Sequence, residues 1–180
     1  MLKGKNVILR PVRESDLPFL VERNAEFEHR GEWYPHHYYS EPTLRKDFEK
    51  DGFWSDQHGQ LFMTDAEGGK ILGEIHYFKT VPYMSELEIA YRTYDPSSRR
   101  KGITSESVRV LTRYLFESMQ VHRIRLCIAT DNVASRGVAE KAGYTHEGTQ
   151  RGAWFNNGRL YDMELYAITI DDVLGSPATG

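Results

Sequence analysis

A short basic turn with a glycine lies between a predicted strand and a predicted helix, and it has the composition of an anion site. Three cations, Arg99, Arg100 and Lys101, precede Gly102. The start of a helix presents N–H groups without partners and a partial positive charge, and a glycine lets the backbone approach a ligand closely. The turn therefore predicts a diphosphate site, unless it is only a solvated loop that caps the helix. The predicted contacts are Arg99, Arg100, Lys101, Gly102, Ile103, Thr104 and Ser105.

Carboxylates on a predicted strand are the second candidate for chemistry. Residues 86–94 alternate between apolar and polar side chains, which places Glu86 and Glu88 on one face of a strand. A carboxylate on a central strand is unfavourable unless it serves a function. Glu88 is the candidate general base, directly or through a water, and Glu86 is the second choice. The alternative for each is a salt bridge or an exposed edge position.

An aromatic, histidine-rich segment, residues 32–39, has neither helix nor strand periodicity and is predicted to be a loop. Trp33, Tyr34 and Tyr38 are candidates to line a pocket for an apolar or aromatic ligand. The alternative is that they pack the loop onto the core. Two adjacent histidines in this loop have no third ligand at a suitable spacing, so no metal site is predicted.

Periodicity and turn residues predict a mixed α/β domain with helices on a largely antiparallel sheet. Strands are predicted at residues 7–10, 60–64, 71–78, 86–94, 121–129, 144–152 and 159–168. Helices are predicted at residues 16–24, from 40 to about 48, at 104–119 and at 132–142. The length of 180 residues predicts one domain, residues 1–172, followed by a flexible tail, residues 173–180.

Composition excludes several classes of protein. Hydrophobic residues make up 39% and charged residues 27%, which excludes a disordered chain. The longest apolar run has four residues, against the roughly 20 that a membrane span needs. A net charge of −3 argues against nucleic acid as a partner. The lone Cys127 is predicted to be a buried core residue rather than a nucleophile, and it favours the reducing cytoplasm.

Several segments, in order along the chain, resemble the GNAT superfamily of N-acetyltransferases. Arg99-x-x-Gly102-x-Thr104 looks like its acetyl-CoA signature. Four other segments resemble the ribosomal-protein alanine acetyltransferase (RimJ/RimL-like) subgroup. They are Leu9-Arg-Pro-Val-Arg-Glu-Ser-Asp16, Glu88-Ile-Ala-Tyr-Arg92, Asn132-Val-Ala-Ser135 with Glu140-Lys-Ala-Gly-Tyr144, and Gly158-Arg-Leu-Tyr-Asp162. The resemblance implies a GNAT fold, whose central sheet is splayed at the cofactor cleft and carries helices on both faces.

The resemblance also implies roles for individual residues. Acetyl-CoA, the acyl donor, is expected to pair through its pantetheine arm with the backbone near Arg92, Thr93 and Tyr94 and to contact Asn132. Ser135 is expected to bind the cofactor and to act as the acid for the leaving thiolate, unless it only helps to cap its helix. In the last hairpin, the resemblance implies that Asp162 is structural or faces the substrate. Asp162 is also a further candidate for the base.

Two positions depart from the pattern of the family. The last signature position usually holds a small residue, but here it is Thr104, whose hydroxyl is expected to donate to a phosphate. Many relatives outside the subgroup carry a tyrosine acid eight positions into the asparagine motif, where this chain has Ala139. The tyrosine mechanism is therefore not expected.

The expected function is transfer of an acetyl group, by direct attack, onto a primary amine. The acceptor is a small molecule (antibiotic, amino sugar or amino acid) or a protein or peptide N-terminus, and the aromatic loop favours an apolar acceptor over a polyamine. The alternative is a catalytically silent acyl-CoA-binding sensor or assembly module, motivated by Thr104 and by the missing tyrosine. A homodimer is expected from the resemblance alone.

Overall fold

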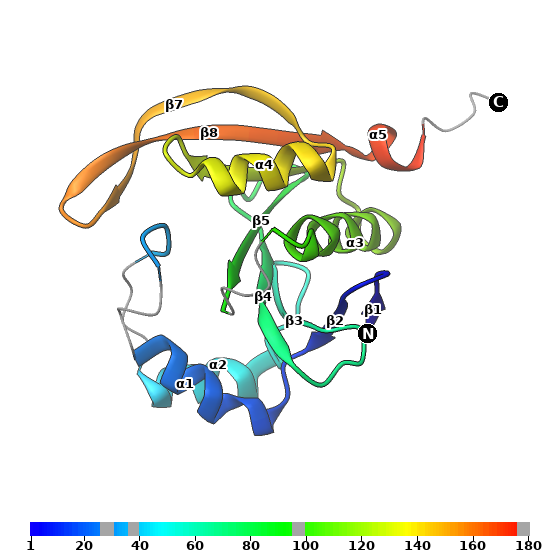
Figure 1. Cartoon of the computed structure of the whole chain (residues 1–180), viewed down its shortest axis with the longest axis vertical. Helices are drawn as coiled ribbons and strands as arrows, with labels where there is room; N and C mark the ends of the chain where they lie inside the picture. Colours follow the sequence, from blue (N-terminus) through cyan, green and yellow to red (C-terminus); the bar gives the residue numbers. More distant parts are fainter. Residues whose placement is uncertain (26–30, 36–39, 95–99, 176–180) are drawn as a thin grey trace.

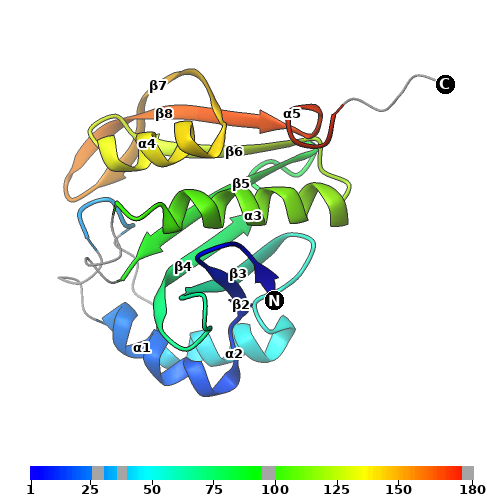
Figure 2. The same ribbon diagram turned by 45° about the vertical axis from the view of Figure 1, so that its right-hand side comes forward.

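The computed structural model describes residues 1–25, 31–35, 40–94 and 100–175, which form an eight-stranded sheet with helices on both faces (Figures 1 and 2). The strands are β1 (Leu2–Lys3), β2 (Ile8–Pro11), β3 (His58–Thr64), β4 (Ile71–Phe78), β5 (Glu86–Thr93), β6 (Arg123–Ala129), β7 (Thr145–Asn156) and β8 (Arg159–Thr169). The helices are η1 (Glu14–Asp16), α1 (Leu17–Ala25), α2 (Glu41–Asp51), α3 (Ile103–Ser118), α4 (Val133–Ala142) and α5 (Ile170–Leu174).

Each strand and helix predicted from the sequence is present, and the prediction of a mixed α/β fold is confirmed. The structure adds β1, and it extends the last hairpin to Asn156 and Thr169. It also adds α5, whose Val173 packs against the core. The predicted end of the domain at residue 172 is therefore too early, because the helix continues to Leu174; residues 176–180 lie outside the described part.

The strand order is β1-β2-β3-β4-β5-β6-β8-β7, and each neighbouring pair is antiparallel except β5 and β6. The parallel pair is short, because it ends where Glu88 pairs with Arg125. Beyond that point β5 continues along β4 to Thr93, while β6 continues along β8 to Ala129. The two strands therefore diverge, which is the predicted splay in the centre of the sheet.

Two hydrophobic clusters fix the helices on the sheet. On one face, Val108, Leu111 and Leu115 of α3 are fully buried against the sheet, and α4 contributes Ala139. On the other face, α1 and α2 enclose a smaller cluster around Phe62, at the β2–β4 end of the sheet (Figure 1). None of the described helices is long and apolar enough to cross a membrane.

The helix α4 begins and ends where its sequence predicts. Asn132 caps it, since its Oδ1 accepts a hydrogen bond from the Ser135 N–H at 3.1 Å. Gly143 follows the last residue with a φ of +92°, a left-handed conformation that glycine adopts without strain. The Asn132 N–H also donates to the Ala129 carbonyl at 2.8 Å, which ties the first turn of α4 to the end of β6.

A close approach between β4 and β5 requires a glycine at position 73. A Cβ atom there would clash with the Arg92 carbonyl oxygen and with the Met63 methyl group, since both lie far closer than van der Waals contact allows. We expect Gly73→Ala to lower the free energy of unfolding by about 1–3 kcal/mol, as overpacking does. Urea denaturation measures this change.

Gly69→Ala is the matched control, because a Cβ atom at Gly69 would meet nothing within 4 Å. We expect this variant to change the free energy of unfolding by less than about 0.5 kcal/mol. Equal losses of unfolding free energy in the two variants would show that close packing at Gly73 does not cause the destabilisation.

Candidate active site

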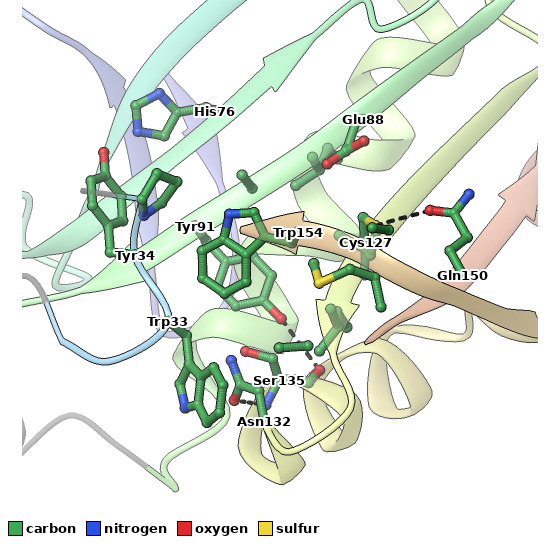
Figure 3. Close-up of a pocket in the computed structure, with 18 of the residues that line it drawn as sticks. Trp33, Tyr34, His76, Glu88, Tyr91, Cys127, Asn132, Ser135, Gln150 and Trp154 are labelled. Atoms are coloured by element: carbon green, nitrogen blue, oxygen red, sulfur yellow. Dashed lines mark hydrogen bonds between the residues drawn. The ribbon is translucent and has the colours of Figure 1, made fainter. Parts of the chain in front are cut away.

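A cavity of about 500 Å³ lies where β5 and β6 diverge (Figure 3). Four consecutive residues of β5, 88–91, line it, and so do four consecutive residues of β6, 126–129. Successive residues of a strand point to opposite faces of the sheet. The cavity therefore passes between the two strands and reaches both faces. This shape allows two substrates to meet from opposite sides.

The two faces differ in what they offer. Ile89 belongs to the core beneath α3, and the Tyr91 hydroxyl donates to the Ser135 carbonyl at 3.3 Å, so we call this face the α4 side. Glu88 and Ala90 point the other way. The segment 31–35 contributes Trp33, Tyr34 and Pro35 there, so we call this face the loop side.

Ser135 has a hydroxyl that is available to a ligand. It lines the cavity beside the Tyr91 hydroxyl, and Asn132 bonds the backbone N–H of Ser135 rather than its Oγ. The capping of α4 is done by Asn132, so the alternative in which Ser135 serves only as a cap has no support from the geometry. Burial raises the pKa of the neighbouring Tyr91 to about 12, so its phenol stays protonated. Ala139, at the position of the absent tyrosine acid, is fully buried.

The turn before α3 is left-handed at two described positions. Gly102 precedes the helix with a φ of +79°, and Arg100 also lies in the left-handed region at +63°. The first N–H groups of α3 have no partner within the helix. Thr104 Oγ1 lies 3.3 Å from Thr93 Oγ1, and a hydroxyl that accepts one hydrogen bond still has a proton to donate. Arg99 lies outside the described residues.

The edge of β5 offers backbone groups to the remainder of a ligand whose diphosphate lies at the turn. Beyond Glu88 this edge has no strand partner on its β6 side, so its N–H and C=O groups there are open to a ligand. Thr93 lies at its end, opposite Gly73 of β4. With the turn, this edge and Asn132, the α4 side fits an extended molecule that carries a diphosphate.

The side chain of Arg92 has a different environment from its backbone. Its guanidinium lies 2.8 Å from a carboxylate oxygen of Glu74 and 3.2 Å from Asn24 Oδ1, and both ends of the ion pair are almost completely buried. It also stacks on two rings, 4.1 Å from the centre of Tyr34 and 4.9 Å from that of Tyr94. Arg92 therefore ties the loop that carries Tyr34 to the central sheet.

The two candidate carboxylates of β5 lie at different places. Glu88 lines the cavity and accepts a hydrogen bond from Arg125 at 2.9 Å. Burial raises the pKa of the Glu88 carboxyl above its ordinary value, and Arg125 offsets part of that rise. Glu86 lies outside the cavity lining and forms ion pairs with Arg123 at 2.6 Å and Arg125 at 3.1 Å. The salt-bridge alternative thus applies to both carboxylates, but Glu88, which pairs with Arg125, lines the cavity and Glu86 does not.

The aromatic loop packs against the last hairpin. Trp33 meets Tyr161 edge to face at 5.7 Å, and Tyr161 in turn packs on Trp154 at 5.3 Å. Asn156 donates to the Glu32 carbonyl at 3.3 Å. The loop therefore both packs on the fold and lines the cavity, so the two alternatives for it are compatible. Tyr38 falls outside the described residues.

Asp162 lies outside the cavity lining. Its carboxylate accepts a hydrogen bond from the Gly152 N–H at 2.7 Å, within an irregular part of β7 between Gln150 and Trp154. The geometry supports the structural role for Asp162, because this bond holds the bulge that precedes Trp154. Among the described residues, no three His, Cys, Asp or Glu side chains are grouped as metal ligands.

Several cavity residues were not predicted from the sequence. Cys127 was expected in the core, but it lies on the opposite face of β6 and lines the cavity, with its Sγ 3.8 Å from Gln150 Oε1. Burial raises the pKa of its thiol to about 11, which agrees with the expectation that it is no nucleophile. Trp154 comes from β7, and His76 from the same face of β4 as Glu74. Strand alternation was a usable signal for His76, but the contact between β7 and the cavity has no sequence signal.

The buried ion pair gives a test of how the loop side is held. Arg92→Met leaves the Glu74 carboxylate buried without its partner, and we expect a loss of about 3–5 kcal/mol in the free energy of unfolding. Arg113→Met removes an exposed ion pair with Glu117 on α3 and is the control. Its expected change is below about 1 kcal/mol. Urea denaturation of both variants is the measurement, and a small loss for Arg92→Met would contradict the assigned role of the pair.

Known proteins share both the sequence pattern and this fold. Residues 6–145 match the family described as Acetyltransferase (GNAT) domain. Among curated relatives, "Probable N-acetyltransferase YjcK" of Bacillus subtilis is 28% identical over 180 residues, covering 96% of this chain and 98% of its own length. The ribosomal-protein-serine acetyltransferase of Escherichia coli is 27% identical over 153 residues, covering 84% of each chain. The latter agrees with the resemblance to the RimJ/RimL-like subgroup.

A solved structure shows the same arrangement of strands and helices. It is the spermidine N-acetyltransferase from Vibrio cholerae in complex with CoA and spermine, with a TM-score of 0.80, 21% identity, and coverage of 95% of this chain and 99% of that chain. The expectation of an acetyl-CoA-dependent N-acetyltransferase is confirmed, and the silent sensor has no support from these relatives. The chain belongs to the GNAT family of acetyltransferases, whose acyl donor is acetyl-CoA.

Proposed function

We propose that this enzyme acetylates the primary amine of a monoamine with an apolar or aromatic body, either a small molecule or a peptide N-terminus. Acetyl-CoA approaches from the α4 side and the acceptor from the loop side. The observation that carries the proposal is the cavity between β5 and β6, which reaches both faces of the sheet and has aromatic rings on its loop side.

The charge of the cavity supports a monoamine over a polyamine. A polyamine brings additional positive charges, each of which calls for a carboxylate. Among the described residues that line the cavity, Glu88 is the one carboxylate, and Arg125 already pairs with it. The rings of Trp33 and Trp154 instead offer apolar surface to the body of the acceptor. On this ground the acceptor differs from spermidine, for which the Vibrio cholerae relative is named.

The residues of the α4 side are proposed to hold acetyl-CoA, which supplies a thioester-activated acetyl group when bound. The turn from Arg99 to Ser105 provides N–H groups and cations for the diphosphate. The open edge of β5, including the backbone of Arg92, Thr93 and Tyr94, and the Asn132 side chain are proposed to hold the pantetheine arm.

Two side chains are proposed to assist the transfer. Ser135 donates its hydroxyl proton toward the departing sulfur, which its position in the cavity lining beside Asn132 and Tyr91 supports. Glu88 meets the incoming amine from the loop side, either as the base or as a fixed negative charge that attracts the ammonium form. Tyr34 is proposed to contact the body of the acceptor together with Trp33.

We also propose a localisation and an oligomeric state for the enzyme. We place the enzyme in the cytoplasm, because a lone Cys127 suits a reducing compartment. A homodimer is proposed from the family resemblance, and light scattering of the purified chain tests it.

The acceptor class is tested by thiol release from acetyl-CoA. The panel contains peptides with Ala, Ser and Met N-termini, aromatic amines, aminoglycosides, amino acids and polyamines. We expect the highest kcat/KM with an apolar or aromatic monoamine or a peptide, and at least tenfold less with spermidine or spermine. A preference for polyamines would contradict the proposed acceptor. Calorimetry with acetyl-CoA alone separates a failure of donor binding from a wrong choice of acceptor.

Ser135→Ala tests the proposed acid. We expect kcat to fall by about 100-fold, in the range of general acid catalysis, while the Kd for acetyl-CoA changes little. Ser118→Ala is the control, since Ser118 on α3 bonds to the Tyr114 carbonyl and lies outside the cavity lining. Unchanged turnover in Ser135→Ala would remove the acid role, and a loss of acetyl-CoA binding alone would make Ser135 a binding residue.

A further inference from the structure

The loop side of the cavity contains an imidazole that is not among the residues proposed above to assist the transfer. His76 lines the cavity from β4, and a quarter of its side chain is exposed there (Figure 3). It lies directly across from Ala90 of β5, whose small side chain leaves room above the ring. The same cavity contains Glu88, so two groups able to accept a proton face the acceptor.

The two nitrogens of the His76 ring have different surroundings. Nε2 is buried and lies 3.5 Å from a carboxylate oxygen of Glu74, with no closer hydrogen-bond partner among the described residues. Nδ1 has no hydrogen-bond partner among the described residues, and it is absent from their buried unpartnered atoms, so it lies on the accessible part of the ring. A carboxylate behind one ring nitrogen favours the proton on that nitrogen and leaves a lone pair on the other. Here the free lone pair belongs to the nitrogen that faces the cavity.

Glu74 is held firmly enough to orient the ring. Its carboxylate accepts a hydrogen bond from Gln60 at 2.9 Å and pairs with Arg92 at 2.8 Å, and its side chain is 1% exposed. Burial by itself would raise the pKa of Glu74, but the protonated form of His76 and the guanidinium of Arg92 lower it to about 2. The pair with Arg92 favours the ionised carboxylate also when the ring is neutral.

Resting on the proposed function, we propose that His76 is the catalytic base that accepts the proton of the acceptor amine, and that Glu74 is the residue that positions it. Glu88, paired with Arg125, is then the fixed charge that attracts the ammonium group. Imidazole titrates nearest to neutral pH, which suits a base that must be regenerated in each cycle.

The attack of the amine is accompanied by transfer of its proton. The N–H bond of the amine breaks and Nδ1 of His76 takes the proton, while the amine nitrogen forms its new bond to the acetyl carbonyl carbon. The carbon–sulfur bond breaks with its electron pair on sulfur, which takes up a proton from Ser135 or from water. An acceptor that binds as ammonium loses its extra proton to solvent before the attack. Afterwards His76 returns its proton to solvent, and Ser135, where it was the donor, takes a proton back from water.

Few charged groups of the described residues face the His76 ring. Glu74 faces the ring from its own strand, and Glu88 and Arg92 face it from β5. Gln60 lies opposite it on β3, and Tyr34 reaches the same cavity from the loop.

The test is the pH profile of kcat/KM, measured with whichever amine the panel identifies. We expect the wild-type enzyme to lose activity toward acid pH. His76→Gln should lower kcat/KM by about 100-fold and remove this acid limb, leaving only the ionisation of the amine itself. Glu88→Gln should lower kcat/KM but keep the limb. Glu74→Gln should lower kcat/KM, because the ring loses the carboxylate that positions it.

His58→Gln is the matched control. His58 on β3 also faces a carboxylate, Asp51 at 3.3 Å, but lies outside the cavity lining, so its removal should leave the profile unchanged. Addition of free imidazole to His76→Ala should restore part of the lost rate, which a purely structural role would not allow. Without acetyl-CoA present, the acceptor amine should shift the NMR signals of the His76 ring and leave those of His58 in place.

The outcomes separate the two proposals. If the wild-type enzyme is active, and His76→Gln keeps the acid limb while Glu88→Gln loses it, Glu88 is the base and the assignment of His76 is overturned, although the proposed function stands. If the wild-type enzyme transfers acetyl groups to no amine, both proposals fall.

Discussion

The early end of pairing between β5 and β6 is the constraint on which the site depends. The parallel contact ends at Glu88, and from there each strand follows a different neighbour. One interruption of the sheet thus has two effects. It leaves polar backbone groups open along an edge that would otherwise be buried in a ladder, and it forms a passage through the sheet. A fully paired sheet would separate the two substrates instead of letting them meet.

Each side of this passage is held by a different kind of interaction. On the α4 side, backbone geometry dominates, with the Asn132 cap, the left-handed Gly102 and the free N–H groups at the start of α3. These features suit a ligand that is the same throughout a family. On the loop side, side chains dominate, with aromatic packing around Tyr161 and the stacking of Tyr34 on Arg92. Side chains change readily during evolution, which suits the acceptor as the variable partner.

Glu74 links these features more closely than its buried position suggests. The same carboxylate pairs with Arg92, which holds the loop, and lies near His76, which lines the cavity. A buried ion pair contributes little to stability, but it fixes the relative positions of its two side chains. In this fold it aligns a strand, a loop and an imidazole within one cavity. Changes at Glu74 should therefore affect acceptor geometry as well as folding.

Local patterns in the sequence determined the elements and the ends of the helices that border the proposed cofactor side. Strand alternation, helix caps and the glycine turn are local signals, and they placed Asn132, Ser135 and the turn at Gly102 correctly relative to their own elements. Only the tertiary structure decided which polar side chains meet. Glu86 and Glu88 look alike in sequence, but the end of the β5–β6 pairing places one among arginines and the other in the cavity. His76, Cys127 and Trp154 reach the cavity from three different strands, and such long-range contacts depend on strand order and on the bulge in β7, for which no local pattern exists.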